Sequence, residues 1–252
     1  PFGVWRKAYL EGADRPFSIA VEREDGKITV QHTFLRGADY GEANYRYAER
    51  TVKFLLWSVG GFRVYLNGDD AVIARLQKAY TPEGDRAFDV QFMRDVYERP
   101  FEVLSVSKED FPEAKEAAVA AGGHMKGCRI GFDAGGSDRK VSAVINGESV
   151  YSEEVVWFPK LQSDPDYHYQ GILEAMKTAA SKMPRVDAIG VSSAGIYVNN
   201  RIMAASLFIK VSEEDCEKRV KNMYLDIAKE IGENTPTINT TVSTKSTHFF
   251  AI

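Results

Sequence analysis

A pair of adjacent glycines between two strand-like segments is the strongest constraint on what this chain can fold into. Residues 130–140 read Ile-Gly-Phe-Asp-Ala-Gly-Gly-Ser-Asp-Arg-Lys, and an apolar segment follows at 141–145. Because glycine has no Cβ atom, backbone N–H groups in such a turn can approach a ligand closely. The turn leads into a strand rather than a helix, which excludes a Walker loop and a dinucleotide fingerprint. The pattern predicts a β-hairpin that binds phosphate at its tip; a plain glycine-rich hairpin is the alternative.

The segments around the hairpin alternate in the manner of an α/β domain. Three antiparallel strands, a helix and a parallel strand are expected, and Ser212 and Asp215 predict a capping-box start for a further helix. The expected elements are strands at 128–132, 141–145, 149–157 and 186–192, helices at 166–182 and 212–231, and either a strand or a connector at 201–207. This order resembles the ribonuclease-H-like half-domain from which actin-like ATPases are built, and implies a mixed sheet.

The first part of the chain predicts a smaller, separate α/β domain. A hairpin is expected where Asp25-Gly26 separates two strand-like segments, because this dipeptide favours positive φ. The expected elements are strands at 17–21, 28–34, 62–66 and 101–106, helices at 42–59, 70–79 and 88–96, and a short helix plus connector at 108–123. The composition changes around the last helix. We therefore expect an accessory domain over 1–125 and a second domain over 126–252.

The glycine motif resembles the first phosphate motif of the ROK (repressor, open reading frame, kinase) sugar kinases. That resemblance implies ATP and Mg²⁺ as cofactors and a sugar as substrate. It implies that the nucleotide phosphates are bound by Asp133, Gly135, Gly136, Ser137 and Lys140. Arg139 is an alternative to Lys140 as the source of positive charge. The resemblance also implies that Asp133 reaches the Mg²⁺ ion through water, which suits a hard cation with oxygen ligands.

A second motif strengthens the resemblance. Residues 186–195 read Val-Asp-Ala-Ile-Gly-Val-Ser-Ser-Ala-Gly, similar to the strand that borders the substrate cleft in these kinases. The resemblance implies that Ser193, Gly195, Asn199 and Ser206 line this cleft. A buried strand that ends in a small-residue turn is the alternative for the motif, and a simple turn is the alternative for the two adjacent asparagines.

The resemblance fails at the catalytic base. ROK kinases carry an aspartate after the long helix, where it takes the proton of the sugar hydroxyl. Here Asp226 is the last aspartate, and Asn239 and Thr240 stand near the expected motif. We therefore expect the catalytic residue to be absent and this chain to be an inactive, truncated form of an ATP-dependent sugar kinase. A non-catalytic sugar- or nucleotide-sensing regulatory protein with the same fold is the alternative.

Composition limits the remaining functions. The net charge of −4 is not gathered into a basic stripe, so nucleic acid is not expected as a partner, and no apolar run is long enough to span a membrane. Cys128 and Cys216 form no metal or redox pattern, which favours reduced thiols and a cytoplasmic location. A homodimer is compatible with these features. His168 with two nearby aspartates could bind a metal, but an acidic helix N-terminus is favoured.

Overall fold

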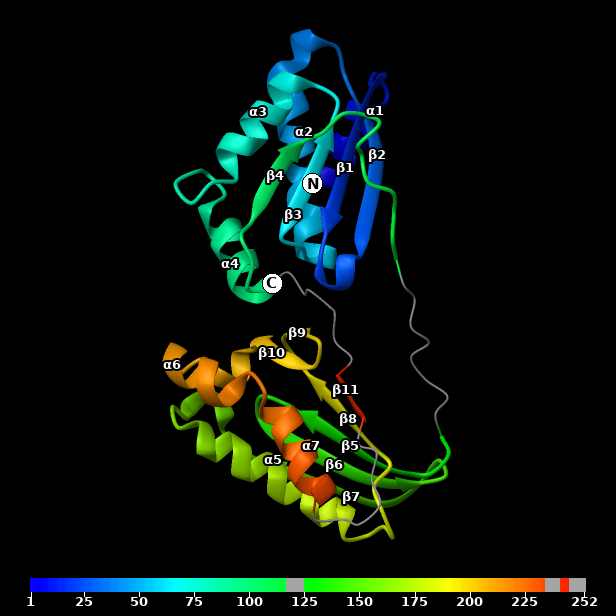
Figure 1. Ribbon diagram of the computed structural model, residues 1–252, viewed down its shortest axis with the longest axis vertical. Coiled ribbons are helices and arrows are strands. Elements are labelled where there is room, and N and C mark those ends of the chain that lie inside the picture. Colours follow the sequence, from blue (N-terminus) through cyan, green and yellow to red (C-terminus); the bar gives the residue numbers. More distant parts are fainter. Residues whose placement is uncertain (117–124, 234–240, 245–252) are drawn as a thin grey trace. The chain divides into compact units, whose positions relative to one another are not determined.

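A computed structural model of the chain describes residues 1–116, 125–233 and 241–244. Their contacts form two compact units, one before and one after the segment 117–124. Each unit combines helices with a sheet (Figure 1), and each sheet contains both parallel and antiparallel neighbours. The mixed α/β class expected from the sequence is therefore confirmed. The domain boundary expected after residue 125 stays a prediction.

The first unit is built on a four-stranded sheet with the order β2-β1-β3-β4. Strand β1 runs antiparallel to β2 and β3, and β3 runs parallel to β4. The elements are α1 (Phe2–Leu10), β1 (Arg15–Glu22), β2 (Ile28–Leu35), α2 (Gly41–Val59), β3 (Arg63–Asn67), α3 (Asp70–Ala79), α4 (Ala87–Tyr97) and β4 (Glu102–Ser105).

Local signals account for most boundaries in this unit. Asp25 and Gly26 adopt positive φ in the turn between β1 and β2, as the sequence predicts. The carboxylate of Asp69 accepts a hydrogen bond from the amide of Val72 and caps α3. Helix α1 is an element that the sequence analysis did not identify. Its Tyr9 is buried against the core, whereas most of its other residues are exposed.

The second unit has a five-stranded sheet with the order β11-β8-β5-β6-β7. Strand β6 is antiparallel to β5 and β7, whereas β5, β8 and β11 are mutually parallel. Helices α5 and α7 lie together on one face of this sheet (Figure 1). The elements are β5 (Cys128–Ala134), β6 (Asp138–Ile145), β7 (Glu148–Val156), α5 (Pro165–Ala180), β8 (Ala188–Ser193), β9 (Ile196–Val198), β10 (Arg201–Ala204), α6 (Glu213–Asp215), α7 (Met223–Glu233) and β11 (Thr241–Thr244).

The alternating pattern of β5 and β8 determines which side chains reach the core. Ile130 and Phe132 of β5, with Ile189 and Val191 of β8, are buried under the helices. The residues between them point to the opposite face of the sheet, because successive strand residues alternate sides. This second face carries the polar and small residues of the glycine motif's strands.

A short helix plus connector is expected over 108–123. Residues 108–116 form no helix, and 117–123 lie outside the described residues. Pro112 disfavours helical backbone at the residue before it, and Lys115 pairs with Ile28 by a β-bridge.

The helix expected over 212–231 is interrupted. A π-turn at Cys216–Val220 separates α6 from α7. The carbonyl of Lys221 accepts a hydrogen bond of 2.8 Å from the amide of Ile202, so tertiary pairing with β10 replaces regular helix geometry there. The expected cap is present: the Ser212 hydroxyl accepts from the Asp215 amide at 3.1 Å.

Candidate phosphate-binding site

The glycine turn connects β5 to β6, and Trp157 donates two hydrogen bonds to it. The indole Nε1 of Trp157 donates a 2.8 Å hydrogen bond to the carbonyl of Gly135. The backbone amide of Trp157 donates to the carbonyl of Ser137 at 3.1 Å. Trp157 is only 3% exposed, so both contacts come from a rigidly packed residue. The turn is thus fixed at two of its carbonyls, and its amide groups are left to other partners.

The two glycines of the turn are not equivalent. A Cβ atom on Gly135 would lie 2.5 Å from the backbone carbonyl oxygen of Asp138, a distance that no side chain tolerates. A Cβ atom on Gly136 would meet only the end of the Lys160 side chain, at 3.1–3.2 Å. Neither glycine adopts a positive φ. Space, rather than backbone conformation, therefore requires glycine at 135, whereas a Cβ atom at 136 requires only that the flexible end of Lys160 shift.

Lys160 is a candidate phosphate ligand that the sequence analysis missed. It lies in the short helical turn η3 (Pro159–Leu161) that follows β7, and its side-chain end reaches the turn at Gly136. The residue is exposed, and among the described residues it has no carboxylate partner. A lysine ammonium beside unshielded backbone amides is a suitable partner for a phosphate oxygen. Only the fold brings it to a loop more than twenty residues earlier in the chain.

Asp133 and Lys140 lie next to one another on the sheet face that the helices do not cover. They are paired across β5 and β6, and Asp133 is also paired with Ser192 of β8. All three line a cavity of about 560 Å³ formed on this face. The other lining residues are Gly131, Phe132, Val141, Ser142, Ser152, Gly190 and Val191.

The ammonium group of Lys140 lies near two carboxylates. Its ammonium lies 3.4 Å from Asp138 and 3.9 Å from Glu154. The hydrogen bond to Asp138 raises the pKa of Lys140 above its ordinary value, so the side chain stays positively charged at neutral pH. Arg139, the alternative source of positive charge, has a different environment. Its guanidinium lies over the Trp157 ring, 5.9 Å from the centroid, on the helix-covered face.

The residues expected to line a sugar cleft are spread over several elements. Ser193 is buried on the helix-covered side near Tyr197 and Tyr224, opposite to its neighbour Ser192. Burial raises the pKa of the Tyr224 hydroxyl well above its ordinary value. The hydroxyls of Ser193, Tyr197 and Tyr224 are buried near one another, and Ser193 does not line the cavity of Asp133.

The other cleft candidates lie beyond the end of β8. A Cβ atom on Gly195 would be 2.5 Å from the carbonyl of Ala204, so glycine lets the chain pack closely on β10. Asn199 is in the turn between β9 and β10, where it and its neighbour adopt positive φ, as in a two-residue hairpin turn. Ser206 begins the turn η4 (Ser206–Phe208). Neither Asn199 nor Ser206 lines the cavity that contains Asp133.

The residues present are compatible with Mg²⁺ held mainly by water and phosphate. Among the described residues, no group of three His, Cys, Asp or Glu side chains could hold a metal ion by itself. Mg²⁺ commonly uses one or two carboxylates, retains several waters and binds substrate phosphates. Asp133, with the hydroxyl of Ser192 beside it, provides such an oxygen surface at the end of β5.

His168 is a buried residue that hydrogen-bonds to backbone carbonyl groups. Its ring is fully buried, and its Nε2 lies 3.0 Å from the carbonyl oxygen of Pro159 and 3.1 Å from that of Leu207. The side chain of Asp164 caps α5, and Asp166 pairs with an arginine. The interpretation as an acidic helix N-terminus therefore describes this segment. The segment 234–240, where the catalytic base was expected and not found, lies outside the described residues.

No protein-family model and no curated protein sequence matches the chain. Solved structures with partial similarity include a protein of Listeria monocytogenes provisionally described as an N-acetylmannosamine kinase (24% identity, TM-score 0.32). They also include a provisionally assigned sugar kinase of Cytophaga hutchinsonii (15% identity, TM-score 0.33). The alignments cover 46% and 47% of this chain, but 35% and 36% of those chains. The Aquifex aeolicus PPX-GPPA enzyme aligns over 70% of this chain and 64% of its own, with 11% identity and a TM-score of 0.19. In the part of the chain that the structure describes, no helix is long and apolar enough to cross a membrane.

Proposed function

We propose that the second unit carries the phosphate-binding half of an ATP-dependent sugar kinase site of the ROK type. The observation that supports this most is the geometry of the β5–β6 hairpin. Trp157 fixes the turn at Gly135, and Asp133 stands at the end of β5 between Lys140 and Ser192. A plain hairpin needs neither a buried tryptophan under its tip nor a carboxylate flanked by a cation and a hydroxyl.

The strand arrangement supports a ribonuclease-H-like half-domain. In the order β7-β6-β5-β8-β11, only β6 runs opposite to the other strands. Strands β5 and β8 therefore end at the same edge of the sheet, where the glycine turn and the end of the second motif are found. Ligands of open α/β sheets commonly bind beyond the carboxyl ends of such strands.

Each residue of the site would have a separate task. The amides of Gly135, Gly136 and Ser137 and the ammonium of Lys160 would bind phosphate oxygens. Asp133 would hold Mg²⁺ through water, and the ion would neutralise charge on the phosphates when bound. Lys140 would offset the negative charge of the carboxylates near Asp133. No described residue is assigned as the base that would activate a sugar hydroxyl.

Binding of Mg-ATP, measured by titration calorimetry, tests the phosphate site. Gly135→Ala places a methyl group against the Asp138 carbonyl and displaces the turn, so its affinity should fall at least tenfold. Gly41→Ala is the control, because a Cβ atom there has no heavy atom within 4 Å and the residue lies in the first unit, so its affinity should be unchanged. Equal affinities for the two variants, or no binding by the unaltered chain, would refute the proposal.

The competing function is a sensor that binds the same ligands without turnover. Both functions require the phosphate site, but they differ in whether the γ-phosphate is transferred once the ligands are bound. Sugar-stimulated release of ADP from Mg-ATP, followed across a panel of hexoses and amino sugars, would indicate a kinase. Sugar binding with no ADP release would favour the sensor. Asp133→Asn should abolish ADP release but leave the fold intact, because its carboxylate faces the cavity and not the apolar core.

A further inference from the structure

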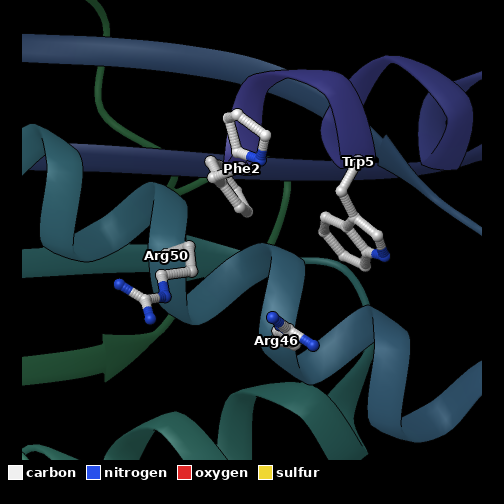
Figure 2. Close-up of a pocket in the computed structure, with 5 residues that line it drawn as sticks. Phe2, Trp5, Arg46 and Arg50 are labelled. Carbon is white, nitrogen blue, oxygen red and sulfur yellow. The ribbon is translucent and has the colours of Figure 1, made fainter.

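A pocket of about 390 Å³ lies in the first unit, between the start of α1 and the solvent side of α2 (Figure 2). It is lined by Pro1, Phe2, Trp5, Arg46 and Arg50. Pockets of a few hundred Å³ are large enough for a small organic ligand. The kinase proposal does not involve these residues, which belong to the other unit of the chain.

One wall of the pocket is aromatic. Phe2 and Trp5, one helical turn apart on α1, stack with ring centroids 5.6 Å apart and an angle of 30° between planes. Trp5 in turn stacks on Tyr9, with centroids 5.1 Å apart, and Tyr9 is buried in the core. The exposed rings are therefore anchored through a buried one. Phe2 and Trp5 form an apolar wall against which the body of a ring-shaped ligand can pack.

The other wall carries two arginines at i and i+4 on α2. Figure 2 shows Arg46 and Arg50 on the helix turns that lie across from Phe2 and Trp5. The guanidinium of Arg46 lies over the Trp5 ring, 5.4 Å from its centroid. A guanidinium stacked in this way is oriented in advance, and its N–H groups point outward in the plane of the fork.

The positive charge of this wall is not neutralised within the pocket. Arg50 is 52% exposed, and its contact with Glu49 is a long one of 3.8 Å. The Glu49 carboxylate also pairs with Arg86 on its other side. Among the described residues, none that lines the pocket is acidic. Two arginines held one turn apart repel each other, and an anion between them would remove this repulsion.

We propose that this pocket binds a small phosphomonoester that carries a ring. A phosphate dianion offers three acceptor oxygens, which suits two guanidinium forks better than a single carboxylate does. The attached ring would lie against Phe2 and Trp5. Aromatic rings pack on the faces of both nucleobases and sugars, so a nucleoside monophosphate and a sugar phosphate share the chemistry required.

Phenyl phosphate is the simplest probe, and its binding to the whole chain is measured by calorimetry and by quenching of tryptophan fluorescence. We expect binding that weakens with salt and falls at least tenfold in Arg46→Ala and in Arg50→Ala. Arg94→Ala is the matched control, because Arg94 is exposed on α4 and outside the pocket, and it should bind as the unaltered chain does. Trp5→Phe should keep most of the affinity but lose most of the quenching.

Three results would overturn the inference. Phenyl phosphate could fail to bind at millimolar concentration, or could bind equally well to the Arg46→Ala/Arg50→Ala double variant. Inorganic phosphate could bind as tightly as phenyl phosphate, which would leave the aromatic wall without a role. Titrations with a nucleoside 5′-monophosphate and with a hexose 6-phosphate then distinguish the two sources of the ring. The Gly135→Ala variant, which tests the other unit, should not change any of these affinities.

Discussion

The buried histidine of the second unit offers the most direct test of how its elements are held together. His168 on α5 places its Nε2 between the carbonyl oxygens of Pro159 and Leu207. These carbonyls belong to η3, which carries Lys160, and to η4, which contains Ser206. Replacing the ring by leucine keeps an apolar side chain of similar size but removes the donor that connects the two turns to the helix.

The cost of His168→Leu can be worked out from the groups left without a partner. The buried carbonyl oxygen of Leu207 would be left unsatisfied, at a cost of about 1–3 kcal/mol, whereas the Pro159 carbonyl keeps a hydrogen bond from the amide of Gln162. We therefore expect a total of about 1–3 kcal/mol. This is a large fraction of the roughly 5–15 kcal/mol that stabilises a typical domain. His168→Gln keeps a side-chain N–H and should recover about half of the loss.

Hydrogen exchange followed by mass spectrometry suits this prediction, because peptides from the two units are read separately. The opening free energy of peptides from α5 and β8 should fall in His168→Leu, while those from β1 and β3 should not change. His32→Leu is the control, since that histidine is exposed on β2 and contacts Ser18 at 2.9 Å. A change below about 0.5 kcal/mol in His168→Leu, or a glutamine variant no better than leucine, would refute the reasoning.

Further outcomes concern the loop, acid stability and a helix start. Trp157→Phe removes the donor to the Gly135 carbonyl. The opening free energy of this loop, measured by hydrogen exchange, should fall by about 1–2 kcal/mol, and Mg-ATP binding measured by calorimetry should weaken. The Arg185 guanidinium and the first amide of β5 hold the pKa of Asp187 below its ordinary value. This stabilisation is therefore complete above about pH 4 and lost as the pH falls through the lower folded value, so Asp187→Asn should flatten the acid side of the stability curve. Ser212→Ala removes the cap of α6 and should cost about 1 kcal/mol in urea unfolding.

The sequence predicted those parts of the structure that depend on short-range signals. The strands around the glycine turn, the helix before β8 and the Ser212 cap all follow from periodicity and capping residues within a few positions. The shared face of Asp133 and Lys140 is also a local result. A hairpin places residues at equal distances from its turn opposite one another, and strand side chains alternate faces.

The remaining features depend on contacts between distant segments. Neither Lys160 nor Trp157 has any local signal that would place it at the glycine turn. The π-turn after Cys216 results from pairing with β10, which lies outside the helix itself. The arginine pair on α2 can be found in the sequence at i and i+4. However, the pocket beside these arginines is completed by α1, and the short sequence of α1 does not predict a helix.

The alternating burial of β5 limits where residues can be inserted into this sequence. Phe132 points into the apolar layer, and Asp133, the next residue, points to the cavity. One residue inserted within β5 before this pair would exchange the two sides, burying a carboxylate and exposing a phenyl ring. Among relatives of this chain, insertions and deletions should therefore be excluded from this strand, and the spacing from Cys128 to Gly135 should stay constant.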